Sequence, residues 1–262
     1  MRRKTILGII GAFCLALLLF VDGWAENSSN SGHWVSAWST AVHAPLAFPG
    51  LPPSPVFENQ TIRMIVRTTI GGERLRIRFS NAFGTTSLKI GSAHVALSSK
   101  ASAIVPESDH ALTFGGKASV TVPPGAPILS DPIELKVLPL SELAVSVYLP
   151  EKAASSSVHF WAQHETYISE SGDFATRQDI PNPTTKTSWY WLADFEVWAP
   201  NQTSAAVAFS DSITMALGRS KASIRTGRIY WQIASPLRKT RRLWPFSTKE
   251  SVVTESCTMA PE

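Results

Sequence analysis

The sequence has few cysteines, and this shortage excludes whole classes of structure. Only Cys14 and Cys257 occur among 262 residues. Because Cys14 falls inside a predicted leader, the mature chain would keep a single thiol. An intramolecular disulfide and a cysteine-rich metal site are then both excluded.

Long hydrophobic runs are scarce outside the N-terminus. There, Arg2-Arg3-Lys4 precedes an apolar run from Ile6 to Val21, and Gly23-Trp24-Ala25 supplies small residues before Glu26. This order is typical of a secretion signal, and the run is short for a membrane span. Residues 1–25 are therefore predicted to be a cleaved signal peptide of a secreted or periplasmic protein. An uncleaved leader is the alternative, and it would be the chain's one attachment to a membrane.

A sustained helical period is also missing. Arg74–Phe79 alternates charged and apolar side chains, which predicts a strand with one wet face, and Leu143–Leu149 alternates in the same way. Gly71-Gly72 after Thr61–Ile70 predicts a hairpin into the following strand. After a polar linker over residues 26–33, we expect residues 34–200 to form an antiparallel β-sandwich or jelly-roll-like domain.

Excess charge of one sign is confined to the last fifth of the chain. Residues 213–262 hold nine Lys and Arg and three Glu, which leaves 15 basic and 17 acidic side chains elsewhere. The body of the protein is therefore close to neutral, and no nucleic-acid partner is expected. The cluster Arg238-Lys239-Thr240-Arg241-Arg242 would be a nucleic-acid or membrane patch in another context, but here we interpret it as accidental.

The texture of the sequence changes after residue 200. Ala205–Phe209 is continuously apolar, as in a strand buried in a parallel sheet, and it leads into a small polar turn with Ser212 at its tip. Such a strand–turn arrangement exposes the nucleophile of several hydrolase folds. No His, Asp or Asn follows Ser212, so the local motif lacks a later base.

Six stretches of the chain, taken in order, resemble the SGNH (GDSL-type) serine hydrolases, and most closely the secreted members with an N-terminal β domain. They are W-V-S-A-W-S-T-A at 34–41, F-E-N-Q-T-I-R at 57–63, R-I-R-F-S-N-A-F-G at 76–84, G-S-A-H-V-A-L at 91–97, A-L-T-F-G-G at 111–116 and S-D-S-I-T at 210–214.

The resemblance implies that residues 201–214 are the first strand and nucleophile elbow of an α/β/α (flavodoxin-like) domain. Ser212 would be the nucleophile, and its backbone N–H would also be an oxyanion donor. Ser210 stands where the family has glycine, which would strain the turn, and Asp211 is expected to have a turn role. The family's later oxyanion Gly and Asn and its catalytic Asp and His have no counterpart here. Neither a metal nor an organic cofactor is expected.

Residues 215–262 match nothing in that family, and we interpret them as a poorly ordered tail read out of frame. With permitted codons, residues 248–261 read one base earlier give N-E-G-I-S-G-N-R-I-L-Y-D-G-A, which resembles the family's second block. Residues 215–236 treated alike give D-G-A-G-S-K-Q-G-E-Y-T-N-R-T-Y-L-L-A-D-R-L-A, a continuation in family style. A one-base deletion near the Thr214 codon would explain both and would truncate the catalytic domain.

Two clusters in the β region have competing interpretations. His159 and His164 bracket Trp161, and they are either a metal pair or rescued base, or ordinary polar positions on a strand or loop, which we favour. His33, His43, His94 and His110 are scattered without ligand spacing. A second cluster could form a sugar-stacking platform, although core packing is the more usual role of large aromatics: Trp34, Trp38, Trp161, Trp189, Trp191 and Trp198.

The sequence thus predicts a carboxylic ester hydrolase by lineage, acting on a small ester or acylated carbohydrate, whose own chain is inactive. The alternative is a non-catalytic secreted β module that binds carbohydrate or a protein partner.

Overall fold

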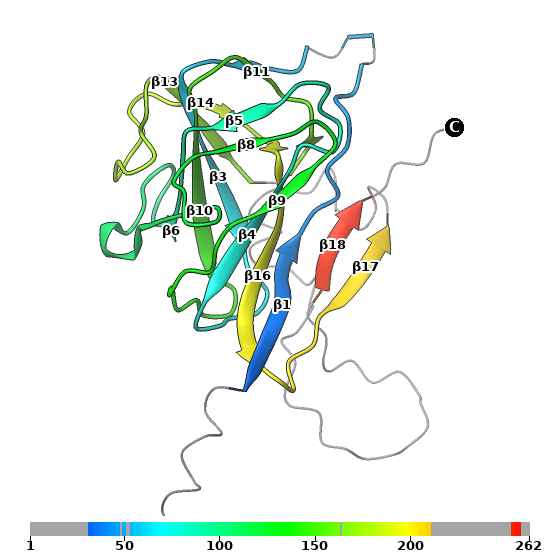
Figure 1. The fold of residues 1–262 in the computed structure, drawn as a ribbon, viewed down its shortest axis with the longest axis vertical. Coiled ribbons are helices and arrows are strands. Elements are labelled where there is room, and N and C mark those ends of the chain that lie inside the picture. The colour runs from blue at the N-terminus through cyan, green and yellow to red at the C-terminus, as the bar shows by residue number, and fades with distance from the viewer. Residues whose placement is uncertain (1–30, 48, 51–52, 163, 211–252, 258–262) are drawn as a thin grey trace, which may run out of the picture. The chain divides into compact units, whose positions relative to one another are not determined.

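The computed structural model of the chain describes five stretches: residues 31–47, 49–50, 53–162, 164–210 and 253–257. These residues fold almost entirely into β-strands (Figure 1). Two antiparallel sheets face each other, so the predicted β-sandwich is confirmed. Of the predicted start of the α/β/α domain, residues 201–214, the last four lie outside the described stretches, and so does the predicted tail apart from residues 253–257.

The smaller sheet has four strands in the order β1-β16-β4-β9. β1 spans Gly32–Ser39, β16 spans Leu192–Pro200, β4 spans Leu75–Ser80 and β9 spans Pro127–Leu129. β1 begins at Gly32 and so starts inside the predicted linker.

The larger sheet has six strands in the order β14-β13-β3-β10-β6-β7. Their bounds are Thr184–Lys186 for β14, Thr166–Ser171 for β13, Gln60–Arg67 for β3, Glu142–Leu149 for β10, Ser92–Leu97 for β6 and His110–Ala111 for β7. β3 and β10 form its centre and pair antiparallel over eight residues, from Glu142 opposite Arg67 to Leu149 opposite Gln60.

Short strand pairs and one 3₁₀ turn complete the sandwich. β2 (Val56–Phe57) pairs with β11 (Ala153–Ala154), β12 (Val158–His159) with β15 (Trp189–Tyr190), and β5 (Leu88–Ile90) with β8 (Val120–Val122), while Pro106–Ser108 forms the turn η2.

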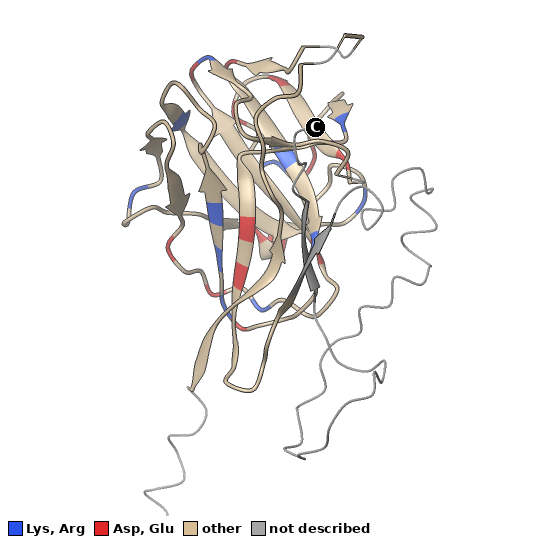
Figure 2. Cartoon of the chain, turned by 90° about the vertical axis from the view of Figure 1, so that its right-hand side faces the viewer, with Lys and Arg blue, Asp and Glu red and all other residues tan. Residues whose placement is uncertain are grey.

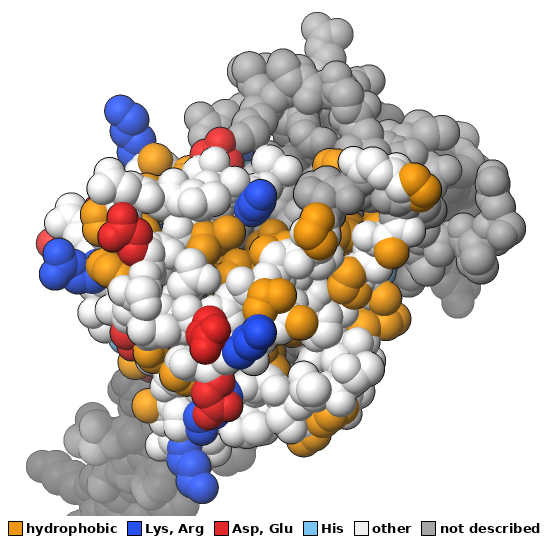
Figure 3. All heavy atoms as spheres, turned by 90° about the horizontal axis from the view of Figure 1, so that it is seen from above, with side chains coloured by type: hydrophobic (Ala, Val, Ile, Leu, Met, Phe, Trp, Pro, Cys, Tyr) orange, Lys and Arg blue, Asp and Glu red, His pale blue; other side chains and the backbone are white. Residues whose placement is uncertain are grey.

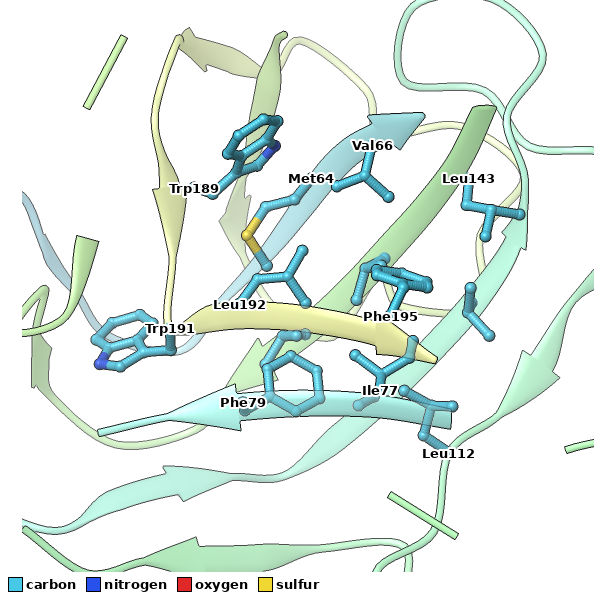
Figure 4. Packing of buried hydrophobic residues seen from close by; sticks show 14 of the residues in the cluster. Met64, Val66, Ile77, Phe79, Leu112, Leu143, Trp189, Trp191, Leu192 and Phe195 are labelled. Atoms are coloured by element: carbon cyan, nitrogen blue, oxygen red, sulfur yellow. The ribbon is translucent and has the colours of Figure 1, made fainter. Parts of the chain in front are cut away.

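The main core lies between the two sheets (Figure 4). Ile77 and Phe79 of β4 and Phe195 of β16 face Met64 and Val66 of β3 in one cluster of buried residues. Strand alternation explains this, because every second side chain of each strand points to the same face. These residues supply the apolar burial on which the fold depends.

A second, smaller core lies on the opposite face of the six-stranded sheet. Ile65, Ala96 and Ala144 pack there with Ile104 and Ile180 from two connecting segments. The prediction that the strand at Leu143–Leu149 has a wet face is therefore wrong. Its alternate residues are covered by these segments, and most of β10 is buried on both sides.

The predicted hairpin at Gly71-Gly72 is also wrong, since β3 and β4 belong to different sheets. Both glycines instead allow close backbone approach. A Cβ on Gly71 would lie 2.3 Å from the carbonyl oxygen of Val137, and one on Gly72 would lie 2.5 Å from that of Trp198. The pair marks the crossing of the chain from one sheet to the other.

The strand predicted at Ala205–Phe209 corresponds to β17, Ala206–Ser210. β17 pairs in parallel with β18, Val253–Cys257, with Ala206 opposite Val253 and Ser210 opposite Cys257. The backbone therefore forms a parallel pair at this point in the chain.

Candidate functional site

The predicted nucleophile elbow is described only up to its first residue. Ser210 is the last residue of β17. Asp211 and Ser212 lie outside the described residues, and so does the basic cluster at 238–242. The assignment of Ser212 as a nucleophile stays a prediction.

All six histidines of the sequence lie in the described residues, so every imidazole that could serve Ser212 can be located. Four of them place Nδ1 against an oxygen: His43 on the carbonyl of Ala44 at 2.7 Å, His94 on Asp109 Oδ2 at 3.0 Å, His110 on the carbonyl of Ser108 at 2.9 Å and His159 on the carbonyl of Ala41 at 3.0 Å.

The pair His94–Asp109 has the imidazole–carboxylate arrangement that orients a catalytic base. His94 lies on β6, and Ser146 stands directly opposite it on β10. Ser146 is buried, however, and its Oγ accepts a hydrogen bond of 2.8 Å from Arg63 Nε. No substrate carbonyl could reach Ser146 without displacing the segments that cover this face of the sheet. We therefore assign Ser146, His94 and Asp109 a structural role.

Histidines and aromatic rings gather around Trp189. The ring of His159 stacks on Trp189 with centroids 5.5 Å apart, and that of His164 stacks on it at 6.0 Å. The ring centroids of His43 and His159 lie 6.2 Å apart. His159 is therefore a buried strand residue and His164 a loop residue, as the favoured interpretation predicted. No cluster of three metal-ligating side chains occurs within the described stretches.

His159 is held as a neutral imidazole by its surroundings. Burial lowers the pKa of His159, with the nearby His43 acting in the same direction, while the hydrogen bond to Ala41 opposes the shift. A neutral imidazole stacked on an indole contributes packing as much as polarity.

The six tryptophans do not form a common platform. Trp38, Trp189 and Trp191 are buried, and Trp38 packs edge-on against Trp189 at 4.8 Å. Trp34 and Trp198 contact each other edge-on, at 5.4 Å, on the outer face of the four-stranded sheet. Trp34 and Trp198 are half-buried, whereas Trp161 is 41% exposed and has a φ of 53°.

Guanidinium groups cover the rings of that outer face. Arg76 lies 4.4 Å from the centroid of Trp34, and Arg74 lies 4.6 Å from that of Trp198. A sugar ring would need one of these ring faces uncovered, so the arrangement favours stabilisation of the sheet over sugar stacking.

Charged residues extend the same face along the sheet. Glu196 bonds to Arg76 and, at 3.0 Å, to Arg78. Ser36 donates a hydrogen bond of 2.5 Å to Asp194. Burial raises the pKa of Asp194. The basic side chains of β4 thus lie beside the acidic side chains of β16, and Figure 2 shows basic and acidic residues on neighbouring strands.

The outer face of the six-stranded sheet carries Arg63, a fully buried arginine that the sequence reasoning missed. Its guanidinium donates to five backbone carbonyls, of Ser102, Phe174, Ala175, Arg177 and Gln178. Burial lowers its pKa to about 10, although Asp109 and Asp179 favour the charged form. The available signal was one charge inside the otherwise apolar run Ile62–Val66.

Scattered apolar side chains also reach the surface. Figure 3 shows them between charged groups at one end of the molecule. The large examples with substantial exposure are Val56, Phe83, Leu138, Leu140 and Trp161. In the part of the chain that the structure describes, no helix has the length and hydropathy of a membrane span.

Comparison with known proteins adds no relative: no protein-family model matches the sequence, and no curated protein matches it.

Proposed function

We propose that the chain derives from secreted or periplasmic ester hydrolases of the SGNH/GDSL type and that its β-sandwich is a non-catalytic module of that architecture. The six sequence stretches that resemble the family support the lineage. In the intact lineage, Ser212 would attack a small ester or an acylated carbohydrate, and neither a metal nor an organic cofactor would be needed.

We propose further that this chain does not cleave esters through Ser212. A general base must lie within about 3 Å of the hydroxyl that it deprotonates. The supporting observation is the position of the imidazole–carboxylate pair His94–Asp109. It belongs to the six-stranded sheet, whereas the last described strand before Ser212 is β17, which pairs with β18 and is part of neither large sheet.

Two further histidines, His43 and His159, are engaged within the sandwich. His43 uses both ring nitrogens within the sandwich, since Nδ1 faces the carbonyl of Ala44 and Nε2 accepts from the amide of Phe160 at 3.4 Å. His159 is buried under the segment that contains His43. Without a base, a serine hydroxyl is a weak nucleophile.

Hydrolysis of p-nitrophenyl acetate by the purified full chain tests this proposal. We expect the chain and its Ser212→Ala variant to give the same rate as buffer. A turnover that Ser212→Ala abolishes would contradict the proposal of inactivity and support the lineage. Resequencing codons 213–216 tests the frame hypothesis, and a chain with its frame restored after Thr214 should gain Ser212-dependent hydrolysis.

A binding module is the second candidate, and Trp161 favours it. Its indole is exposed beside Phe160, with ring centroids 6.3 Å apart, and its left-handed backbone is uncommon for a tryptophan. Retention of the chain on a polysaccharide column, lost in Trp161→Ala, would support this function. Passage through the column in the void volume would contradict it.

A further inference from the structure

The segment that follows β1 is attached to β12 by few bonds, and two of its polar contacts are made by histidines. His43 and Val158 exchange two backbone hydrogen bonds, of 2.8 and 3.0 Å, in an isolated antiparallel bridge. His43 and His159 add side-chain bonds across the same junction. We call residues 41–44 and 158–160 the histidine clasp.

We propose that the histidine clasp is acid-sensitive: protonation of His43 and His159 releases residues 41–44 from β12. The clasp would then couple the acidity of the surroundings to exposure of the aromatic rings beneath it, Trp189 and Trp38.

The tautomer of His43 follows from its two partners. A carbonyl can only accept, so the Nδ1 that lies 2.7 Å from the carbonyl of Ala44 carries the proton. Nε2 is then a bare acceptor, and the amide of Phe160 donates to it at 3.4 Å. Protonation of Nε2 would place two donors against each other, so this bond exists only with neutral His43.

His159 opposes protonation for a different reason. The ring of His159 is buried between Trp189 and residues 41–44. Its Nδ1 already donates to the carbonyl of Ala41. A charged imidazole there would lose solvation, and it would face a second charged imidazole, His43, with ring centroids only 6.2 Å apart.

Two titratable residues, His164 and Glu165, lie close to the clasp in the sequence. His164 also stacks on Trp189. The carboxylate of Glu165 accepts the hydroxyl of Tyr167. In the described stretches, neither His43 nor His159 forms an ion pair with a carboxylate.

The sign of the effect follows from the lowered pKa of folded His159. The clasp is fully stabilised above the pKa of an unfolded histidine, which is about 6.5. Stability is lost as the pH falls below that value towards the folded pKa, because the open form binds the proton more tightly.

Amide hydrogen exchange of the full chain, followed by NMR at pH 7 and pH 5, tests the proposal. We expect the protection factors of the His43 and Val158 amides to fall about tenfold at pH 5, a change that corresponds to about 1.4 kcal/mol. The amide of Val145, at the centre of β10, serves as the reference and should keep its protection. Equal losses at all three amides, or no loss at His43 and Val158, would overturn the proposal.

Variants separate the two imidazoles from other titrating groups. Gln can donate and accept but does not titrate, so the double variant His43→Gln, His159→Gln should lose the acid effect. His110→Gln is the matched control, since His110 lies on β7 and bonds to the carbonyl of Ser108, and it should keep the effect. A loss of protection at pH 5 that persists in the double variant would contradict the proposal. If that variant does not fold, the wild-type imidazole signals decide: the loss of protection must follow the titration of His43 or His159.

Discussion

The outer faces of the two sheets both carry arginines, but in opposite surroundings. On the six-stranded sheet, Arg63 is fully buried and its guanidinium bonds to the connecting segments that cover it. On the four-stranded sheet, Arg76 and Arg78 stay partly exposed and bond to Glu196. Arginine therefore anchors buried segments on one face. On the other face it belongs to a row of partly exposed charged residues, Arg76, Arg78, Glu196 and Asp194, which we call the charged ladder.

The two guanidinium groups differ in the hydrogen-bond acceptors that surround them. Arg63 donates to five carbonyls of the segments that cover it; two of them, those of Phe174 and Gln178, also accept from backbone amides, and the arginine adds donors for the others. Around Arg76, water could replace any lost contact. A buried charge with a full set of partners is therefore essential to its face, whereas an exposed ion pair is worth little.

The sharpest test of this comparison is Arg63→Met, which keeps an unbranched apolar stem and removes the donors of the guanidinium. The variant should lose about 3–5 kcal/mol of the free energy of unfolding, because the carbonyls of Ser102, Ala175 and Arg177 lose a donor and Asp109 and Asp179 lose a nearby cation. Urea denaturation measures the loss. Arg67→Met, on the same strand but with an exposed contact to the carbonyl of Leu140, is the matched control and should cost far less. Equal losses in the two variants would contradict the role given to Arg63.

The sequence predicts the exposed ladder well and the covered face poorly. Strict alternation from Arg74 to Phe79 places Arg76 and Arg78 on one side of β4, and they are found there, with Arg74 just before the strand. Nothing local to β3 or β10 reveals that their outer sides are covered. The cover comes from segments 39 and more than 110 residues away from Arg63, so it is a tertiary feature that periodicity cannot show.

The hairpin prediction at Gly71-Gly72 is wrong for a related reason: the contacts that decide it are distant in the sequence. Two glycines between strands favour a tight turn locally, but here each glycine gives room to a distant backbone carbonyl. Asn81 of the S-N-A-F-G stretch is similar: its amide bonds to the carbonyls of Thr86, Val122 and Pro123, and two of these are over 40 residues away. Of the candidate site, the sequence supplies Ser212 as a hypothesis, whereas the clustering of His43, His159 and Trp189 required coordinates.

On the exposed face, Glu196→Gln sharpens the comparison by removing the charge that Arg76 and Arg78 share. We expect a loss of about 1 kcal/mol, well below that of Arg63→Met, since these ion pairs are only partly buried. The difference between the variant and the parent should shrink further in 1 M salt, where charges are screened over about 3 Å. Glu134→Gln is the control: its carboxylate lies 3.9 Å from Arg74 and is largely exposed. A loss from Glu196→Gln as large as that of Arg63→Met would remove the distinction between the two faces.

The smallest expected change in stability is at Asp194. Burial of this side chain disfavours its ionised form. Burial raises the pKa of this carboxyl above its unfolded value, so the ionised form costs stability at neutral pH, and the cost disappears as the pH falls through the folded pKa. Asp194→Asn keeps an acceptor for Ser36 and removes the charge. It should leave the free energy of unfolding unchanged or raise it by up to about 0.5 kcal/mol at pH 7, within the range of surface substitutions. The gain should vanish as the pH falls through the folded pKa, because protonation of the wild-type carboxyl removes the same charge. A variant that is less stable at pH 7 than at pH 4, relative to the parent, would mean that the carboxylate stabilises this face and that the ladder depends on charge more than the comparison allows.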